Sequence, residues 1–205
     1  MTKTVFLDRD GTLNREIGFF GSPDRLELLP GVGDALQRLH DGNFRLVITT
    51  NQSGIARGLY SEQDLARVHE RLHELVGRLP LAYLHCPHHP DAEGGDPAYR
   101  RDCDCRKPKS GLLHQASKML QDLGVTLADS VVIGDSARDL MMADQLPMTK
   151  ILVASGKPIE LERQKLADAG CAPDHEAADL AAAVTWLLQR SLEDSPAGRR
   201  AARNE

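Results

Sequence analysis

The chain has 205 residues and a formal net charge of -5, with 41% hydrophobic and 27% charged residues. These values are ordinary for a single globular domain, and the acidic balance argues against a nucleic-acid binder, which usually carries a basic surplus. No apolar run approaches the ~20 residues that span a bilayer, and no basic segment with a long apolar stretch opens the chain. We therefore expect a monomeric, cytoplasmic protein that binds neither nucleic acid nor a membrane.

Short apolar runs alternate with segments of helical periodicity, which predicts a parallel sheet flanked by helices. The expected strands lie at residues 5–7, 46–48, 81–84, 131–133 and 151–153. The expected helices lie at residues 32–39, 65–79, 112–123, 161–169 and 180–188. Ser61 with Asp64 three residues later is a helix-start signature, and Gly42 can end the first helix in a left-handed conformation. We expect an α/β fold with a doubly wound, Rossmann-like parallel sheet, forming one domain over residues 1–190 and a mobile tail over 191–205.

Polar residues follow three of the expected strands, namely Asp8, Thr50 and Asp135. Ligands of open parallel sheets bind beyond the carboxyl ends of the strands, so these residues should meet at one edge. Asp8 and Asp10 can take different roles where the chain bends: one attacks phosphorus, and the other donates a proton to the leaving oxygen. A pair of surface aspartates at a turn is the alternative interpretation of this motif alone.

Three further segments favour phosphoryl transfer, which needs in-line geometry and charge neutralisation. Residues 49–53 offer a hydroxyl and backbone N–H groups to phosphoryl oxygens, and Lys107 offers a positive charge. Gly134 to Asp139 places carboxylates at the fourth strand end, where they suit Mg²⁺. A capping threonine, a solvated lysine and acidic residues that open a helix are the structural alternatives, but the placement at strand ends favours the chemical interpretation.

Four short motifs resemble those of the haloacid-dehalogenase superfamily: Asp8-x-Asp10-Gly11-Thr12, Thr50, Lys107 and Gly134-Asp135-x-x-x-Asp139. The resemblance implies a nucleophile at Asp8 and a general acid, later a base, at Asp10. It implies that Thr50 and Lys107 bind the phosphoryl group and that Asp139 plays a supporting role. The implied ligands of a catalytic Mg²⁺ are Asp8, the backbone carbonyl of Asp10 and Asp135. The segment before Thr50 is already occupied by a helix and a strand, so we expect no cap domain.

Residues 86–108 have almost no apolar side chains, so an ordered loop of this length needs a specific cause. The loop carries the right number of thiols and imidazoles for a closed tetrahedral Zn²⁺ site: Cys86, His88, Cys103 and Cys105. His88 is preferred to His89 by analogy with the family, and the zinc would also fix Lys107. Unrelated free thiols or a redox pair are the alternatives, although Cys-x-Cys lacks the thioredoxin-like spacing. Cys171 stands apart, and we expect it to be a buried small hydrophobe.

The stretch from Thr50 to Gly58 and the Cys/His motifs narrow the resemblance to the D-glycero-D-manno-heptose 1,7-bisphosphate 7-phosphatases. This implies a role in bacterial surface polysaccharide biosynthesis, with a phosphorylated sugar as substrate. The histidinol-phosphate phosphatases are similar and are the alternative. By position, the implied contacts with the substrate are Glu16, Gly18, Phe19, Asn51, Gln52, Ser53 and Arg106. Some members of the family have lysine where this chain has Ser136, which leaves a substrate contact at that position open.

Three other functions are alternatives: a zinc-stabilised binding module, a phosphotransferase or phosphomutase, and a polynucleotide 3′-phosphatase. The absence of a basic stripe disfavours a nucleic-acid ligand, whether bound or hydrolysed. Nothing in the sequence indicates an acceptor site for phosphoryl transfer to a second substrate. The sequence therefore favours a phosphatase that transfers the phosphoryl group to water.

Overall fold

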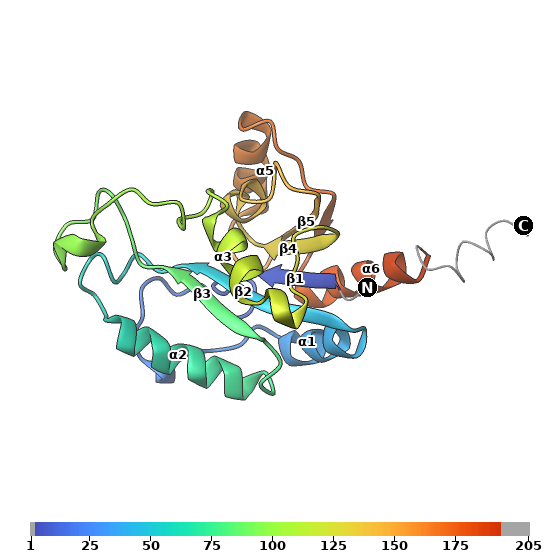
Figure 1. Ribbon diagram of the computed structural model, residues 1–205, viewed down its shortest axis with the longest axis horizontal. Coiled ribbons are helices and arrows are strands. Elements are labelled where there is room, and N and C mark those ends of the chain that lie inside the picture. Colours follow the sequence, from blue (N-terminus) through green and yellow to red (C-terminus); the bar gives the residue numbers. More distant parts are fainter. Residues whose placement is uncertain (1–2, 194–205) are drawn as a thin grey trace, which may run out of the picture.

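A six-stranded parallel sheet forms the centre of the computed structural model, which describes residues 3–193 (Figure 1). The strand order is β3-β2-β1-β4-β5-β6, and every neighbouring pair is parallel. The strands are β1 (Lys3–Leu7), β2 (Phe44–Asn51), β3 (Ala82–Cys86), β4 (Ser130–Gly134), β5 (Met148–Val153) and β6 (His175–Ala177). The five expected strands are present, whereas β6 is a short edge strand without the apolar run that would reveal it in the sequence.

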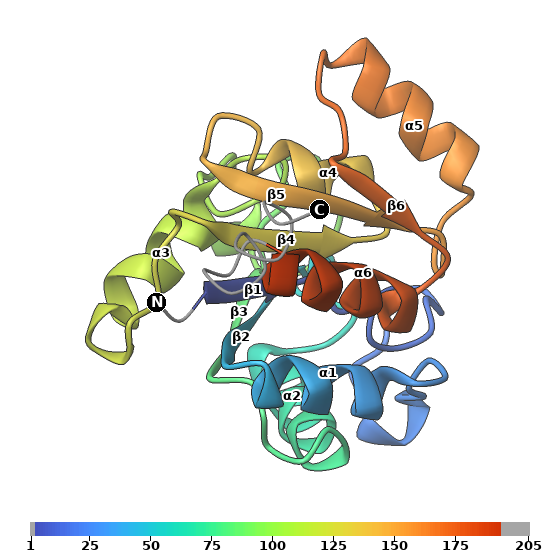
Figure 2. The same cartoon turned by 90° about the vertical axis from the view of Figure 1, so that its right-hand side faces the viewer.

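Helices cover both faces of the sheet, as Figures 1 and 2 show. Their bounds are α1 (Val32–Asp41), α2 (Glu62–Leu75), α3 (Gly111–Met119), α4 (Ala137–Met141), α5 (Ile159–Asp168) and α6 (Leu180–Glu193). Buried side chains of α1, α2 and α6 share one core cluster with the sheet, and those of α3, α4 and α5 pack on the opposite face. The doubly wound α/β fold is confirmed. No helix within residues 3–193 is both long enough and apolar enough to cross a membrane.

Strand β1 illustrates how the sequence produces this layering. Val5 and Leu7 point into the core beneath α1 and α6, while Phe6 points into the core beneath α3. All three are fully buried, because successive side chains of a strand alternate between faces and both faces carry helices. Burying one such side chain contributes about 1.5–3 kcal/mol, so these short runs anchor the sheet.

Of the two helix ends predicted from the sequence, one is confirmed and the other is wrong by one residue. Ser61 and Asp64 form the expected capping box at the start of α2. The left-handed end of α1 was predicted at the wrong residue, since Gly42 has φ -73° and Asn43 takes the left-handed conformation at φ 61°. Gly42 serves packing instead, because a Cβ there would lie 2.8 Å from the side chain of Leu188 in α6.

The expected helix bounds differ most from those observed at the C-terminal ends of α2, α3 and α6. Helix α2 ends at Leu75 and not at residue 79, because Gly77 and Arg78 adopt left-handed conformations just beyond it. Helix α3 ends at Met119, and a short 3₁₀ turn continues over Gln121–Leu123. Helix α6 continues past the domain boundary expected at residue 190, as far as Glu193. The remainder of the expected tail lies outside the described residues.

Candidate active site

Asp8 and Asp135 lie where the strand order of the sheet reverses. Strands β1 and β4 are neighbours there, and Asp8 follows β1 while Asp135 follows β4. Such a reversal leaves a crevice at the carboxyl ends of the strands. The loops that contain Gly11 and Gly156 pack closely against Asp135. A Cβ on either glycine would clash with Asp135 Oδ2. Gly11 also has φ 83°, so both its conformation and its surroundings require glycine.

Lys107 links two of the buried carboxylates at this edge. Its Nζ lies 2.7 Å from Asp8 Oδ1 and 2.5 Å from Asp139 Oδ1, and it also donates to the backbone carbonyl of Thr49. Burial alone would lower the pKa of Lys107, but the charges of Asp139 and Asp8 outweigh it and raise that pKa. The ammonium group is therefore a permanent positive charge beside Asp8. Asp139, which was expected to play a supporting role, forms an ion pair with this lysine.

The carboxylates of Asp8, Asp135 and Asp139 form a crowded acidic cluster whose oxygen atoms lie within 4.8 Å of one another. Burial, with the neighbouring carboxylates in addition, raises the pKa of Asp8 to about 6 and that of Asp135 to about 8. Asp135 is fully buried, and its Oδ1 has no hydrogen-bond partner in the structure. A hard divalent cation fits this donor set, because it would occupy the orphaned oxygen and relieve the repulsion. Lys157 Nζ, 3.4 Å from Asp135 Oδ2, supplies part of that charge.

The C-terminal end of β2 and the residue after it hold Lys107, Thr50 and Asp10 in place. The side chain of Asn51 bonds both the backbone N–H and the carbonyl of Lys107, each at 3.1 Å. Gln52 is buried, and its Nε2 donates to Thr50 Oγ1 at 2.8 Å and to Asp10 Oδ2 at 2.9 Å. Asn51 and Gln52, expected to contact the substrate, thus position Lys107, Thr50 and Asp10. Their contact with a sugar stays a prediction.

A cavity of about 70 Å³ lies among these groups. Its lining residues are Asp8, Asp10, Glu16, Thr50, Asn51, Lys107, Ser136, Arg138, Asp139 and Lys157. Pockets that enclose a whole small ligand measure roughly 300–1,000 Å³, so this cavity suits only the transferred group. The rest of a substrate would lie on the rim.

Of the expected sugar contacts on residues 16–19, Glu16 lies at the cavity and Phe19 does not line it. Glu16 lines the cavity, and its carboxylate accepts the backbone N–H of Gly18 at 2.9 Å. The ring of Phe19 is 49% exposed, and the guanidinium carbon of Arg57 lies 5.7 Å from its centroid. Ser53 lies in the turn beneath, where its carbonyl accepts the N–H of Arg57 at 3.2 Å. The contact of Phe19 with a sugar stays a prediction.

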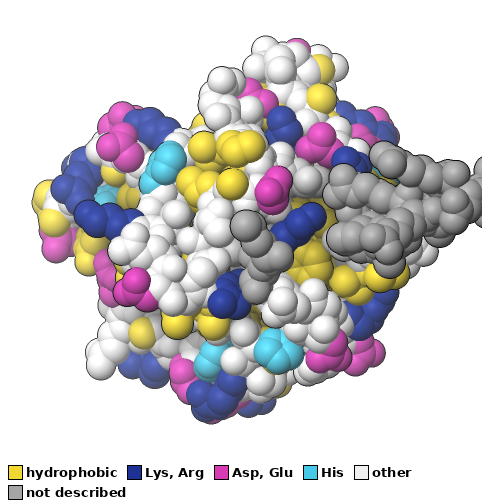
Figure 3. All heavy atoms as spheres, turned by 45° about the vertical axis from the view of Figure 1, so that its right-hand side comes forward, with side chains coloured by type: hydrophobic (Ala, Val, Ile, Leu, Met, Phe, Trp, Pro, Cys, Tyr) yellow, Lys and Arg dark blue, Asp and Glu magenta, His cyan; other side chains and the backbone are white. Residues whose placement is uncertain are grey.

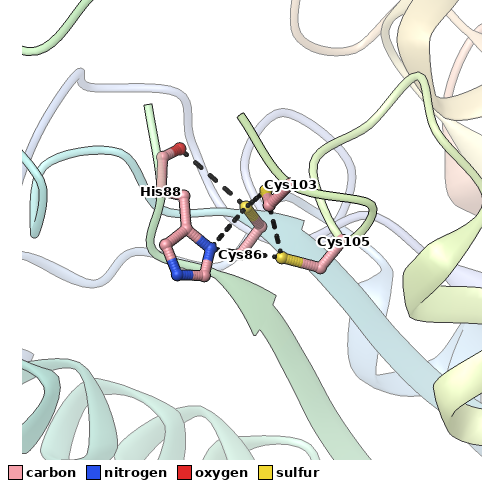
Figure 4. A group of neighbouring side chains, drawn as sticks. All are labelled: Cys86, His88, Cys103 and Cys105. Atoms are coloured by element: carbon pink, nitrogen blue, oxygen red, sulfur yellow. Dashed lines mark hydrogen bonds between the residues drawn. The ribbon is translucent and has the colours of Figure 1, made fainter. Parts of the chain in front are cut away.

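The three thiols and the imidazole predicted to hold zinc converge on one point, as Figure 4 shows. The Sγ atoms of Cys86 and Cys105 lie 3.5 and 3.3 Å from that of Cys103, and His88 Nδ1 lies 3.3 Å from Cys105 Sγ. A tetrahedral zinc with Zn–S bonds of about 2.3 Å places its sulfur atoms about 3.8 Å apart, so the donor set fits Zn²⁺. Arg106 Nη1 donates to the carbonyl of His88 at 3.1 Å, which joins the loop to the residue before Lys107.

Comparisons with known proteins agree with this geometry. Residues 104–183 match the HAD-hydrolase-like family. The chain is 44% identical over 171 residues to the D-glycero-beta-D-manno-heptose-1,7-bisphosphate 7-phosphatase of Haemophilus ducreyi, covering 81% of this chain and 91% of that protein. The enzyme of the same name from Escherichia coli K12 is 38% identical, covering 80% and 85%. The chain belongs to this family of HAD-like phosphatases.

A solved structure supports the same assignment. The D,D-heptose 1,7-bisphosphate phosphatase from B. bronchiseptica, complexed with magnesium and phosphate, is 34% identical to this chain. The two superpose with a TM-score of 0.75, covering 92% of this chain and 99% of that one. The resemblance stated from the sequence motifs is confirmed at the level of the family and its α/β fold.

Sequence reasoning missed three residues of the site. Lys157 and Arg138 line the cavity, and Arg9 is buried beneath Asp10 with its guanidinium against that carboxylate. Lys157 follows β5 after Ser155 and Gly156, so the strand-end rule that located Asp135 could have found it. No such signal marks Arg9, because an arginine between two aspartates at a turn is equally compatible with an exposed position and with a buried one.

Proposed function

We propose that the protein hydrolyses the 7-phosphate of D-glycero-beta-D-manno-heptose 1,7-bisphosphate and leaves the 1-phosphate in place. The observation that carries the chemistry is the position of Lys107, whose ammonium holds Asp8 at the floor of the small cavity. The substrate is proposed from the names of relatives that are 38–44% identical to this chain over alignments that cover about four fifths of it. The heptose would extend over the rim, past Phe19.

Catalysis would proceed in two displacements at phosphorus. The carboxylate of Asp8 attacks the 7-phosphate, the bond from phosphorus to the C7 oxygen breaks, and Asp10 gives a proton to that leaving oxygen. Water then attacks the phosphoryl group on Asp8 and gives its proton to Asp10, so that inorganic phosphate leaves and both carboxylates return to their starting forms. Lys107 and the hydroxyl of Thr50 neutralise and orient the phosphoryl oxygens.

Two metal ions fit the residues present. Asp8, Asp135 and the backbone carbonyl of Asp10 would hold Mg²⁺, which supplies positive charge to the phosphoryl oxygens. Cys86, His88, Cys103 and Cys105 would hold a structural Zn²⁺ that keeps the loop ordered. Cys105 lies two residues before Lys107 in the chain, so zinc bound there would also restrict the position of Lys107.

Surface charge favours a small-molecule substrate over a nucleic acid. On the face drawn in Figure 3, basic and acidic side chains are interspersed. A nucleic-acid ligand would instead be expected to find a continuous basic stripe. This supports the phosphatase over a binding module stabilised by zinc.

The test is a panel of phosphorylated substrates with release of inorganic phosphate as the readout. We expect the highest kcat/KM for the heptose bisphosphate, with ³¹P NMR showing a product that retains the 1-phosphate. Histidinol phosphate and sugar monophosphates are the comparison substrates. A higher kcat/KM for histidinol phosphate would overturn the substrate and leave the two-step mechanism standing.

A further inference from the structure

Arg9 is a buried cation whose charge is directed at Asp10. Its side chain is 2% exposed, and it is among the largest fully buried side chains of the described chain. Nη2 donates to Asp10 Oδ2 at 2.7 Å and to Oδ1 at 2.9 Å, and Nε donates to Oδ1 at 3.1 Å. Burying a guanidinium is costly unless it is paired, so the placement of Arg9 and the placement of Asp10 depend on each other.

The opposite side of the guanidinium is held by His69 of α2. Arg9 Nη1 lies 3.4 Å from His69 Nε2, and because a guanidinium can only donate, Nε2 accepts. Burial and the charge of Arg9 lower the pKa of His69 well below its usual value, which keeps the ring neutral. The imidazole is stacked on Tyr83, with ring centroids 5.1 Å apart, and the ring of Phe20 lies 5.1 Å from the Arg9 guanidinium carbon.

The carboxylate of Asp10 is therefore fixed from several directions. Besides Arg9, Asn14 Nδ2 donates to Oδ1 at 3.0 Å and Gln52 Nε2 donates to Oδ2 at 2.9 Å. Tyr60 in turn donates to Gln52 Oε1 at 2.6 Å. A planar guanidinium sets the plane of the carboxylate that it binds bidentately, which a single-point donor cannot do.

We propose that Arg9 is a positioning residue that aims Asp10 at the leaving oxygen, and that His69 fixes Arg9 from the second helix. The inference rests on the general-acid role given to Asp10 in the proposed function. A purely structural role for the pair would instead require only that the buried charge be neutralised. The two roles predict different losses of kcat/KM when Arg9 or His69 is substituted: a positioning role affects mainly substrates with poor leaving groups, and a structural role affects all substrates equally.

The experiment compares two leaving groups in the variants His69→Leu and His69→Gln. Breaking the P–O bond of the heptose bisphosphate releases heptose 1-phosphate as a poorly stabilised C7 alkoxide, which needs a proton, whereas p-nitrophenyl phosphate releases a stable phenolate. The quantity measured is kcat/KM, because it reports only steps up to phosphorylation of Asp8 and excludes the later hydrolysis. Glutamine keeps an acceptor for Arg9, and leucine removes it.

We expect His69→Leu to lower kcat/KM for the heptose bisphosphate roughly tenfold and kcat/KM for p-nitrophenyl phosphate less than about twofold. General acids contribute about 10²–10⁴-fold to rates, so a tenfold loss corresponds to a general acid that is misplaced but still present. His69→Gln should restore most of the loss. Arg9→Lys, which keeps the charge but loses the bidentate fork, should show the same leaving-group bias. Equal losses on both substrates, or no loss in His69→Leu, would overturn the inference.

Asp10→Asn separates this inference from the proposed function. If Asp10→Asn shows the leaving-group bias and the His69 and Arg9 variants do not, Asp10 is the acid and the positioning role is wrong. If Asp10→Asn shows no bias, the acid assignment itself fails and the inference falls with it. Thermal unfolding of each variant checks that the compared proteins are folded.

Discussion

Asp8 and Asp135 are carboxylates held close together in a buried crevice, and their chemistry follows from that position. Burial raises the pKa of both carboxyl groups above their usual range, to about 6 for Asp8 and about 8 for Asp135. Lys107 opposes this at Asp8, since its ammonium favours the ionised nucleophile. The site is therefore electrostatically incomplete without a further cation.

The nucleophile can be tested by Asp8→Asn, which keeps the shape and removes the attacking charge. Activity toward any phosphate ester should fall by several orders of magnitude, because uncatalysed hydrolysis of phosphate monoesters is among the slowest of known reactions. Asp122→Asn, at an exposed position, is the matched control and should retain activity. Near wild-type turnover by Asp8→Asn would exclude the phosphoryl-aspartate.

Metal binding should couple to pH through Asp135. Its folded pKa is raised from 3.8 to about 8, so the metal-free protein gains stability from it below about pH 4 and loses that stability as the pH rises through 8. Because Mg²⁺ binds the ionised carboxylates, the rise in Tm on adding Mg²⁺ should be larger at pH 8 than at pH 6. Thermal unfolding at both pH values measures it, and Asp135→Asn should abolish the difference. An equal rise at both pH values would contradict this electrostatic account.

The loop between β3 and α3, residues 87–110, shapes the site from outside the sheet. It brings Lys107 to the C-terminal end of β2, where Asn51 fixes its backbone. The loop contributes few apolar side chains to the core, so a metal is the expected source of its order.

Cys103→Ser tests that element. The variant should lose bound zinc, which we expect at about one ion per chain, and its kcat should fall because Lys107 is no longer held. Cys171→Ser is the control, since Cys171 is buried in a separate cluster with α4 and α5 and should leave the zinc content unchanged. Elemental analysis of freshly purified proteins makes the comparison. Wild-type protein without zinc would contradict the four-ligand site.

Within residues 3–193, hydrophobic side chains pack on both faces of one sheet, in one cluster on the α1 face and in two on the other. Leu36 of α1 belongs to the core on one face, and Leu112 of α3 belongs to the core on the other. Strands β1, β2 and β4 contribute side chains to both, so the faces cannot separate without breaking the sheet. We expect a single domain that unfolds in one cooperative transition.

Leu36→Ala and Leu112→Ala test the single domain. Each should lower the free energy of unfolding by about 2–5 kcal/mol, because each removes a fully buried side chain. Both should shift one common transition followed by circular dichroism and by Trp186 fluorescence. Leu161→Ala, at a position that is 59% exposed, should change stability by less than about 0.5 kcal/mol. Two separate transitions would show that the faces are independent units.

The amino-acid sequence was enough to predict five of the six strands, where they end and the chemical kinds of residue at those ends. Apolar runs such as Val5 to Leu7 and the spacing of the Cys and His residues are local signals, and they were enough to predict the fold and the grouping of the zinc ligands. The approach of Asp8 to Asp135 also followed, since parallel strands end at a common edge.

Only the tertiary structure decided which side chains meet within the site. Gln52 could be assigned to the substrate from its position, yet it binds Asp10 and Thr50. Arg9 pairs with His69 across 60 positions of sequence, and that contact depends on how α2 packs against the sheet. The reason is physical: periodicity specifies the face on which a residue lies, whereas the partner of a long polar side chain depends on the packing of elements far apart in the chain.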